Sequence, residues 1–266
     1  MPITKSVDEH IGEVVIDVPP VNALTVAGWF ELAETITTLG RNADVHVVVL
    51  RAEGRGFNAG VDVKEIQADT GNEAIIGANR GCFAAFKAVY ECEVPVVCAV
   101  HGYCLGGGIG LAGNADVIVA SDDATFGLPE VERGALGAAT HLSRLVPQHV
   151  MRAMFYTGET VTAAQLHHFG SVWRVVSKDQ LRDAAFDVAR SIASKHPRVI
   201  RAAKEALNGI DPVDVNRSYR YEQGFTFELN LTNVSDELRQ EFVGRTSDAR
   251  AERGGSGGRS APGTKD

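Results

Sequence analysis

The chain has 266 residues, a formal net charge of -8 at pH 7 and a pI near 5.5. Hydrophobic residues make up 44% of it and charged residues 23%, an ordinary globular composition with enough length for a substantial core. We do not expect so acidic a chain to bind nucleic acid or an anionic membrane, because such partners require a concentrated basic surface.

The N-terminus and the cysteines favour a cytoplasmic protein. No apolar run approaches the roughly 20 residues that cross a bilayer, and residues 1–10 lack the basic-then-apolar order of a signal peptide. All four cysteines fall in one short region, without the paired spacing of metal ligands. Cytosolic thiols are normally reduced, so we expect small core residues rather than disulfides or zinc ligands at Cys82, Cys92, Cys98 and Cys104.

The first half of the chain alternates strands and helices. Four apolar runs predict buried strands, at residues 12–18, 45–50, 95–100 and 116–120. Thr25 caps a helical pattern between the first two, and a short helix from about Asp62 precedes a longer one over residues 73–90. Glycine-rich loops at residues 54–60 and 101–108 follow the second and third strands.

Beyond residue 137 the pattern changes to helices alone. Six are expected, over residues 138–145, 148–156, 163–168, 178–194, 198–208 and 213–231. Such an order predicts an α/β core, which we place at residues 1–195, followed by a helical region over residues 196–245. No linker separates the two parts. Residues 246–266 contain almost nothing apolar, so we expect a disordered tail.

The two glycine-rich loops are candidates for holding a partly negative oxygen. Residues 56–65 follow a buried strand and open a helix, and residues 101–110 do the same one strand later. Glycine lets the backbone approach a ligand closely, and the free N–H groups of a helix N-terminus favour an anionic oxygen. Two such loops on neighbouring strands can aim two N–H donors at one oxygen, as an oxyanion hole requires. For either loop alone, a tight turn with glycines for close packing is the alternative.

Four motifs follow one another along the chain: Pro20-Val21-Asn22-Ala23-Leu24, Phe57-Asn58-Ala59-Gly60-Val61-Asp62, the loop 102–108 and Phe126-Gly127-Leu128-Pro129-Glu130. In order and spacing they resemble the crotonase superfamily of enoyl-CoA hydratases and isomerases, over about residues 10–245. The resemblance implies an α/β fold, a spiral of strand-strand-helix turns with a C-terminal helical trimerisation region. It also implies a homotrimer or a dimer of trimers.

The resemblance assigns roles to backbone groups of both loops. By it, the N–H groups of Val61 and Gly107 hold the carbonyl oxygen of an acyl-coenzyme A thioester, and the Ala59 carbonyl accepts from the adenine amino group. Gly60 and Gly106, beside these groups, are expected to let the backbone approach the substrate. Coenzyme A enters as part of the substrate, and no metal or further cofactor is expected.

Glu130 is the expected acid–base residue. A carboxyl group in an apolar pocket has its charged form destabilised, which raises its pKa toward the range useful for proton transfer. In hydratases of the superfamily a second Glu works beside it, but that position is Gly110 here. Ordinary crotonyl-CoA hydration is therefore not expected. Gly110 also removes a side chain from the pocket floor, which suggests room for a larger acyl group, with close helix packing as the alternative.

His141 and Glu132 are secondary candidates near Glu130. If residues 130–134 are extended, Glu130 and Glu132 share a face, and the turn at residues 134–137 brings His141 back toward them. Histidine has a reference pKa near neutrality, so His141 could assist water activation, although a surface or capping histidine is the alternative.

Three other side chains near the motifs have simpler interpretations. Arg133 is expected to form a structural ion pair with Glu132. Tyr103 is a candidate for lining the pocket. Lys64 is a candidate for approaching the coenzyme A phosphates, and a solvated lysine explains it equally well.

Three longer runs, residues 52–62, 120–134 and 222–231, resemble one branch of the superfamily. Its members are actinobacterial hydrolases that open a ring of the bicyclic steroid remnant during cholesterol and bile-acid breakdown. The branch implies hydrolysis of a C–C bond in a bicyclic indanedione-carboxyl-CoA. An enoyl-CoA isomerase or hydratase is the alternative within the enzymes. A non-catalytic acyl-CoA-binding protein is the weakest alternative, because it needs no Glu130.

Overall fold

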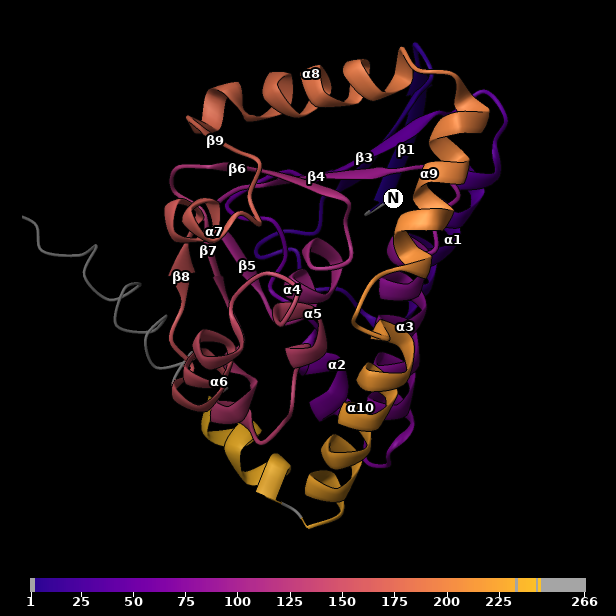
Figure 1. Cartoon of the computed structure of the whole chain (residues 1–266). Helices are drawn as coiled ribbons and strands as arrows, with labels where there is room; N and C mark the ends of the chain where they lie inside the picture. Colours follow the sequence, from indigo (N-terminus) through magenta and orange to yellow (C-terminus); the bar gives the residue numbers. More distant parts are fainter. Residues whose placement is uncertain (1–2, 233, 243, 245–266) are drawn as a thin grey trace, which may run out of the picture.

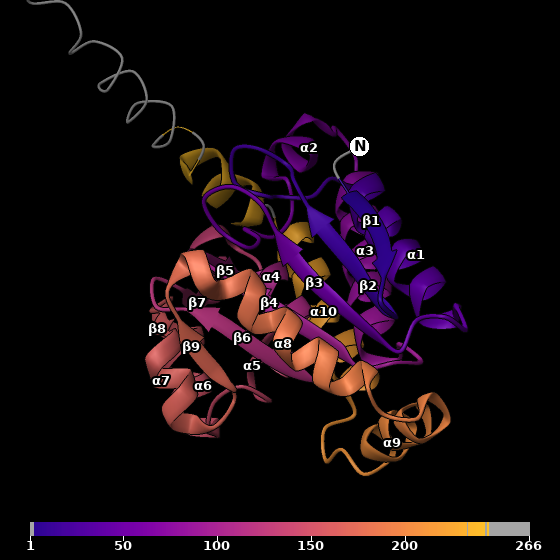
Figure 2. The same ribbon diagram turned by 90° about the horizontal axis from the view of Figure 1, so that it is seen from above.

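Six strands form the main sheet, in the order β1-β2-β3-β4-β6-β9 (Figures 1 and 2). They are β1 (Ile3–Asp8), β2 (Ile11–Ile16), β3 (Val47–Ala52), β4 (Val96–Val100), β6 (Val117–Ser121) and β9 (Arg174–Val176). β1 runs antiparallel to β2, and all the other neighbouring strands of the sheet are parallel. The structure, a computed structural model, describes residues 3–232, 234–242 and 244.

A second, three-stranded sheet gives the chain its spiral path. It contains β5 (Tyr103–Leu105), β7 (Thr125–Gly127) and β8 (Val161–Thr162). β5 follows directly after β4, and β7 follows directly after β6, so each of these turns adds one strand to each sheet. An isolated bridge between Asn58 and Cys104 places the loop after β3 alongside β5. The strand-strand-helix spiral expected from the resemblance is thereby confirmed.

Helices cover both faces of the main sheet. They are α1 (Val26–Arg41), α2 (Val63–Ala68), α3 (Glu73–Tyr90), α4 (Gly107–Ala112), α5 (Ala139–Leu142), α6 (Gln148–Thr157), α7 (Ala163–Phe169), α8 (Leu181–Ala193), α9 (Pro197–Gly209) and α10 (Val215–Leu231), with 3-10 turns η1 (Pro129–Arg133) and η2 (Lys178–Gln180). Thr25 caps α1, as predicted, and Asp62 caps α2 at the expected start of the short helix. No helix in the described part of the chain has the length and apolar character of a membrane span.

The apolar runs of the strands reflect burial on both sides. Val48 and Leu50 of β3 pack into the larger core with α1 and α3, whereas Val47 and Val49 face α8. Figures 1 and 2 show α8 lying across the outer face of the sheet. A strand enclosed by helices on both faces gains from an apolar side chain at every position, so its sequence does not alternate. The four cysteines are buried in these layers without disulfides.

The sequence missed several short strands. β5 and β7 have 3 residues each and β8 has 2, too few for a periodic signal. β8 and β9 also show that the chain beyond residue 137 is not helical throughout. The α/β class with C-terminal helices is confirmed. The division at residue 195 stays a prediction, and the predicted tail, residues 246–266, lies outside the described residues.

Candidate active site

Two buried asparagines hold the loops that carry the site. Asn22 follows β2 with a φ of 54°, and its amide donates to the Glu53 and Gly56 carbonyls at 2.8 Å each. Asn58 donates to the Asn22 carbonyl at 2.5 Å and accepts from the Gly60 N–H at 2.9 Å. The loops after β2 and β3 are thus tied together. Both asparagines belong to the quoted motifs, but their spacing alone did not reveal these bonds.

Two backbone N–H groups are left free where these loops meet α4. In the bridge between Leu24 and Val61, Leu24 makes both hydrogen bonds, to Gly60 and Asp62, so the Val61 N–H faces away. Gly107 begins α4, where N–H groups lack an acceptor within the helix. Neither N–H has an acceptor among the described residues, and both residues line one cavity. Two such donors can together stabilise one oxyanion.

Glycine is needed at the meeting point of the loops. Gly60 has a φ of +87°, and a Cβ atom there would lie 3.2 Å from the Gly107 nitrogen. Gly106 has a φ of +58°, and its Cβ would lie 2.3 Å from Oε1 of Glu130. On the other side, Trp29 packs so closely that a Cβ on Gly107 would lie 2.6 Å from its ring. Larger side chains at these glycines would therefore push the two loops apart.

Glu130 belongs to η1, and its carboxyl group lies between Gly106 and Gly137. A Cβ atom on Gly137 would be 2.4 Å from Cδ of Glu130. The residue as a whole is half-buried, but its Oε2 atom is shielded from solvent and has no hydrogen-bond partner. Burial raises the pKa of Glu130 to about 7, although the nearby Arg133 guanidinium favours the charged form. The direction of this shift agrees with the one expected from the sequence.

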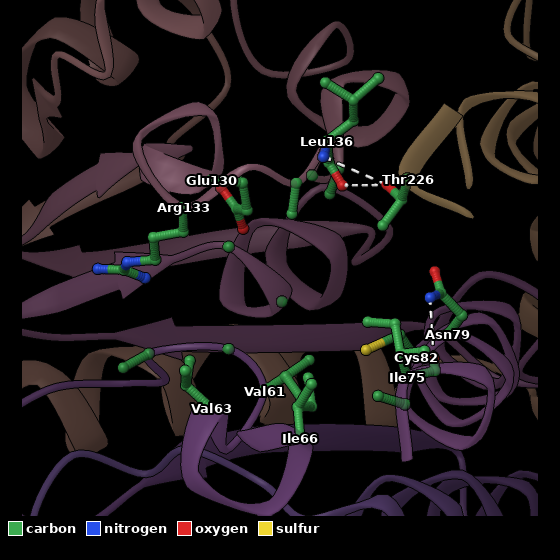
Figure 3. Close-up of a pocket in the computed structure, with 18 of the residues that line it drawn as sticks. Val61, Val63, Ile66, Ile75, Asn79, Cys82, Glu130, Arg133, Leu136 and Thr226 are labelled. Atoms are coloured by element: carbon green, nitrogen blue, oxygen red, sulfur yellow. Dashed lines mark hydrogen bonds between the residues drawn. The ribbon is translucent and has the colours of Figure 1, made fainter. Parts of the chain in front are cut away.

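A cavity of about 120 Å³ joins Glu130 to the two free N–H groups. Figure 3 shows Val61, Val63 and Ile66 on one side of it and Glu130 and Arg133 on the other. Side chains of α3 and α10 complete the lining, among them Ile75, Asn79, Cys82, Phe86, Tyr219 and Thr226. Glu130 is the only carboxylate among the described residues that line it. An apolar cavity with a few convergent polar groups is typical of a small-molecule site.

Residues 6–236 match the sequence profile of the enoyl-CoA hydratase/isomerase family. The chain belongs to this family. The (7aS)-7a-methyl-1,5-dioxo-2,3,5,6,7,7a-hexahydro-1H-indene-carboxyl-CoA hydrolase of Rhodococcus jostii (strain RHA1) is 67% identical to it, over 91% of this chain and 95% of the relative. The hydrolase of the same name from Mycobacterium tuberculosis is 68% identical, over 91% and 99%. The crystal structure of an enoyl-CoA hydratase/isomerase from Xanthobacter autotrophicus Py2 aligns with a TM-score of 0.82 at 26% identity, covering 94% of this chain and 98% of that one.

In this member of the family, Phe86 fills the space beside Gly110. A Cβ on Gly110 would lie 2.2 Å from Cζ of Phe86. Phe86 lines the cavity and Gly110 does not. The phenyl ring also packs edge-on against Trp29, with ring centroids 5.7 Å apart. The space that we expected to admit a larger acyl group is therefore taken by Phe86, and close packing of α4 against α3 explains the glycine.

His141 is buried and does not line the cavity. Its ring packs against Phe86 and Tyr219, with centroids 5.0 and 4.8 Å away, and Nδ1 lies 3.1 Å from Oδ1 of Asn114. Burial lowers the pKa of His141 to about 3, so the ring is neutral at pH 7. These contacts favour a packing role over the hypothesised activation of water.

The turn after β7 differs from the expected extended segment. Residues 129–133 form η1, in which Glu130 faces the cavity and Glu132 is exposed, so the two carboxylates do not act together. The predicted ion pair between Glu132 and Arg133 is wrong, because no such contact forms within 4.0 Å. The Arg133 guanidinium lies instead over the Phe242 ring, 4.1 Å from its centroid.

Three other predicted residues lie around the site in different ways. Tyr103 packs on Gly56 and does not line the cavity, contrary to expectation. Ala59 lines the cavity. Lys64 is exposed in the first turn of α2, where it can reach a ligand or simply be solvated. Contacts of Ala59 and Lys64 with coenzyme A stay predictions.

Glu222 of α10 is a positioning residue that sequence reasoning missed. Its carboxylate accepts from the Ala139 N–H at 2.8 Å and from the N–H and hydroxyl of Thr140 at 3.1 Å each. Burial raises the pKa of Glu222 to about 7. The side chain fixes the start of α5 and the preceding turn, which packs Gly137 against Glu130. No local spacing signals a contact across about 80 residues of sequence.

Proposed function

We propose that the protein hydrolyses a C–C bond in a bicyclic diketone carried as a coenzyme A thioester, opening one ring in steroid degradation. One observation carries the proposal: a single carboxyl group of raised pKa, Glu130, faces the same cavity as two free backbone donors. The two relatives at 67% and 68% identity bear the name of such a hydrolase. Their similarity extends over nine-tenths of the chain.

In the proposed reaction Glu130 takes a proton from water as the water oxygen bonds to the carbon of a ring ketone. The resulting tetrahedral alkoxide collapses and breaks the neighbouring C–C bond. The electron pair of that bond passes to the conjugated thioester, whose oxygen carries the negative charge between the Val61 and Gly107 N–H groups. Glu130 then returns its proton to carbon, and the new carboxylic acid loses a proton to solvent.

The lining of the cavity favours this reaction over hydration of a double bond. A hydratase of the family pairs two carboxylates, and here the second position is Gly110, against which Phe86 packs. No other described carboxylate lines the cavity to orient a water with Glu130. An isomerase needs one proton-shuttling carboxyl, so only the product distinguishes it from the hydrolase.

The test locates the oxygen of water in the product. A bicyclic diketone carboxyl-CoA is incubated with the protein in oxygen-18 water, and the product is fragmented in a mass spectrometer. Label in a carboxylate formed from the ring ketone, in a product that still carries the coenzyme A thioester, is the expected result. Label in an alcohol identifies a hydratase, and absence of label identifies an isomerase; either result overturns the proposed hydrolysis.

We also propose that the protein acts as a homotrimer or a dimer of trimers in the cytoplasm. Support comes from aromatic side chains left exposed beside a groove between α6 and α10, where Tyr156 is 70% and Tyr221 is 74% exposed. Large apolar surface of this kind is commonly covered by a partner. Sedimentation velocity at micromolar concentration checks the assembly, and a single monomeric species contradicts it.

A further inference from the structure

The cavity contains a cationic side chain that the proposed reaction does not yet use. Arg133 lines the cavity from η1, three residues after Glu130. Side chains at positions i and i+3 of a 3-10 helix eclipse one another, so both lie on the same side of the turn. Figure 3 shows both residues on the same side of the cavity, with the Arg133 guanidinium extending away from the Glu130 carboxyl.

The guanidinium of Arg133 makes no ion pair with a described carboxylate, although the charges of Glu130 and Glu132 act on it from further away. Its Nε atom is shielded from solvent and lacks a hydrogen bond, and no carboxylate in the described part of the chain lies within 4.0 Å of the group. The face of the guanidinium is covered by the Phe242 ring. Arg133 is half-buried, and the shielded Nε without a hydrogen bond is costly unless a ligand supplies an acceptor of opposite charge.

A second guanidinium in the same cavity is already paired. Arg239 donates to Oδ1 of Asn230 at 2.9 Å and to the carboxylate of Asp236. Its charge is therefore compensated within the protein, so Arg239 has a structural explanation. Arg133 is the guanidinium available to a bound acyl group.

We propose that Arg133 forms an anion subsite within the acyl cavity, which binds the ring carbonyl oxygen attacked by water and then the carboxylate that replaces it. The planar guanidinium presents parallel N–H donors that match the two oxygens of a carboxylate. While the alkoxide forms, the same donors stabilise the oxygen on which charge develops. One oxygen of the new carboxylate comes from the ketone and the other from water.

Two matched thioesters test the subsite without any turnover. Adipoyl-CoA and hexanoyl-CoA have acyl chains of equal length, and only the first ends in a carboxylate. Calorimetric titration of the intact protein is expected to give at least a tenfold lower Kd for adipoyl-CoA. Arg133→Met abolishes this preference, whereas Arg133→Lys, which keeps a charge without the planar fork, retains part of it. Arg190→Met, on α8 across the sheet, keeps the full preference.

Turnover of the bicyclic diketone thioester supplies the second measurement. Arg133→Met is expected to lower kcat by about 10²–10³-fold, the usual cost of losing an oxyanion donor, with an unchanged melting temperature. The role of Arg133 in turnover rests on the proposed function. The binding and turnover measurements together therefore distinguish a failure of the anion subsite from a failure of the proposed hydrolysis. If the wild type prefers adipoyl-CoA through Arg133 but does not open the ring, the hydrolase proposal fails and the anion subsite stands. Ring opening without an Arg133-dependent preference overturns the subsite.

Discussion

At the scale of single residues, the environment of Glu130 determines what the cavity can do. The carboxyl group lies against Gly106 and Gly137, whose missing side chains leave room for it, and it faces the same cavity as Gly107. Burial disfavours its ionised form, and the Arg133 charge opposes that effect. A carboxyl with a pKa near pH 7 is able both to accept and to return a proton under neutral conditions.

Glu130→Gln is expected to lower kcat by roughly 10²–10⁴-fold, because an amide keeps the shape but takes no proton. Binding of a substrate analogue, measured by calorimetry, should change little. In the wild type, kcat/KM should rise with pH through an apparent pKa of about 7, since the base must be ionised in the free enzyme. A rate that is independent of pH between 5 and 9, or an active Glu130→Gln, removes Glu130 from its assigned role.

The same pKa predicts a pH-dependent stability. Folding raises the pKa of Glu130 from 4.5 to about 7, so the contribution of its protonated form is fully present below pH 4.5 and is lost as pH rises through 7. Glu130→Gln is free of this loss. The difference in unfolding free energy between this variant and the wild type should therefore shift in favour of the variant as pH rises from 5 to 8. The shift should be at most about 3 kcal/mol. Chemical denaturation at both pH values measures the gain, and Glu132→Gln, an exposed glutamate of the same turn, controls for net charge.

Substitutions at Gly110 test why this position lacks the second Glu of the hydratases. The alternatives are room for a larger acyl group and close packing against Phe86. A methyl group there would collide with Phe86, so Gly110→Ala should destabilise the protein by about 1–3 kcal/mol, the usual cost of overpacking. Phe86→Leu provides room, and the double variant should lose less stability than the sum of the two single changes. Additive losses in thermal denaturation would show that the two side chains do not compete for the same space.

At the scale of elements, α10 fixes a turn that belongs to the site although it lies about 80 residues away in sequence. Glu222→Ala removes the acceptor of three hydrogen bonds at the start of α5 and should cost about 2–3 kcal/mol in unfolding free energy. It should also lower kcat more than it raises KM, because the displaced turn carries Gly137 against Glu130. Glu222→Gln keeps one acceptor and should recover part of both losses. An unchanged kcat in Glu222→Ala contradicts the positioning role.

Most elements long enough to show a period could be predicted from sequence, but β1 was missed because every residue of it after Ile3 is exposed. The helix expected over residues 73–90 coincides with α3, whereas β5, β7 and β8 are too short for such a signal. The backbone donors and the role of Glu130 were predicted through the resemblance of ordered motifs to the crotonase superfamily. The roles of Phe86, Arg133 and Glu222 depend on which segments pack together, and a local pattern does not contain that information.

At the scale of the whole molecule, the C-terminal segments cover a cavity built by the N-terminal loops. Thr226 of α10 exchanges hydrogen bonds with the backbone of Leu136, as the dashed lines in Figure 3 show. Residues 234–242 are helical, and Ser235 there donates to the Gly134 carbonyl. In Figure 1 these segments lie at the end of the molecule away from α8. The chain therefore closes the candidate catalytic cavity with residues that follow the spiral core.

Two truncations test this closure. Ending the chain at residue 232 removes Ser235 and Arg239, which are buried against the turn and the cavity, so kcat should fall by more than tenfold and the melting temperature should drop. Ending it at residue 245 removes a segment with almost no apolar side chains, and both quantities should stay near the wild-type values. Turnover of the diketone thioester and differential scanning calorimetry measure both variants. Full activity in the shorter chain would mean that the spiral core closes the cavity by itself, and a large loss in the longer one would give residues 246–266 a role that their composition does not predict.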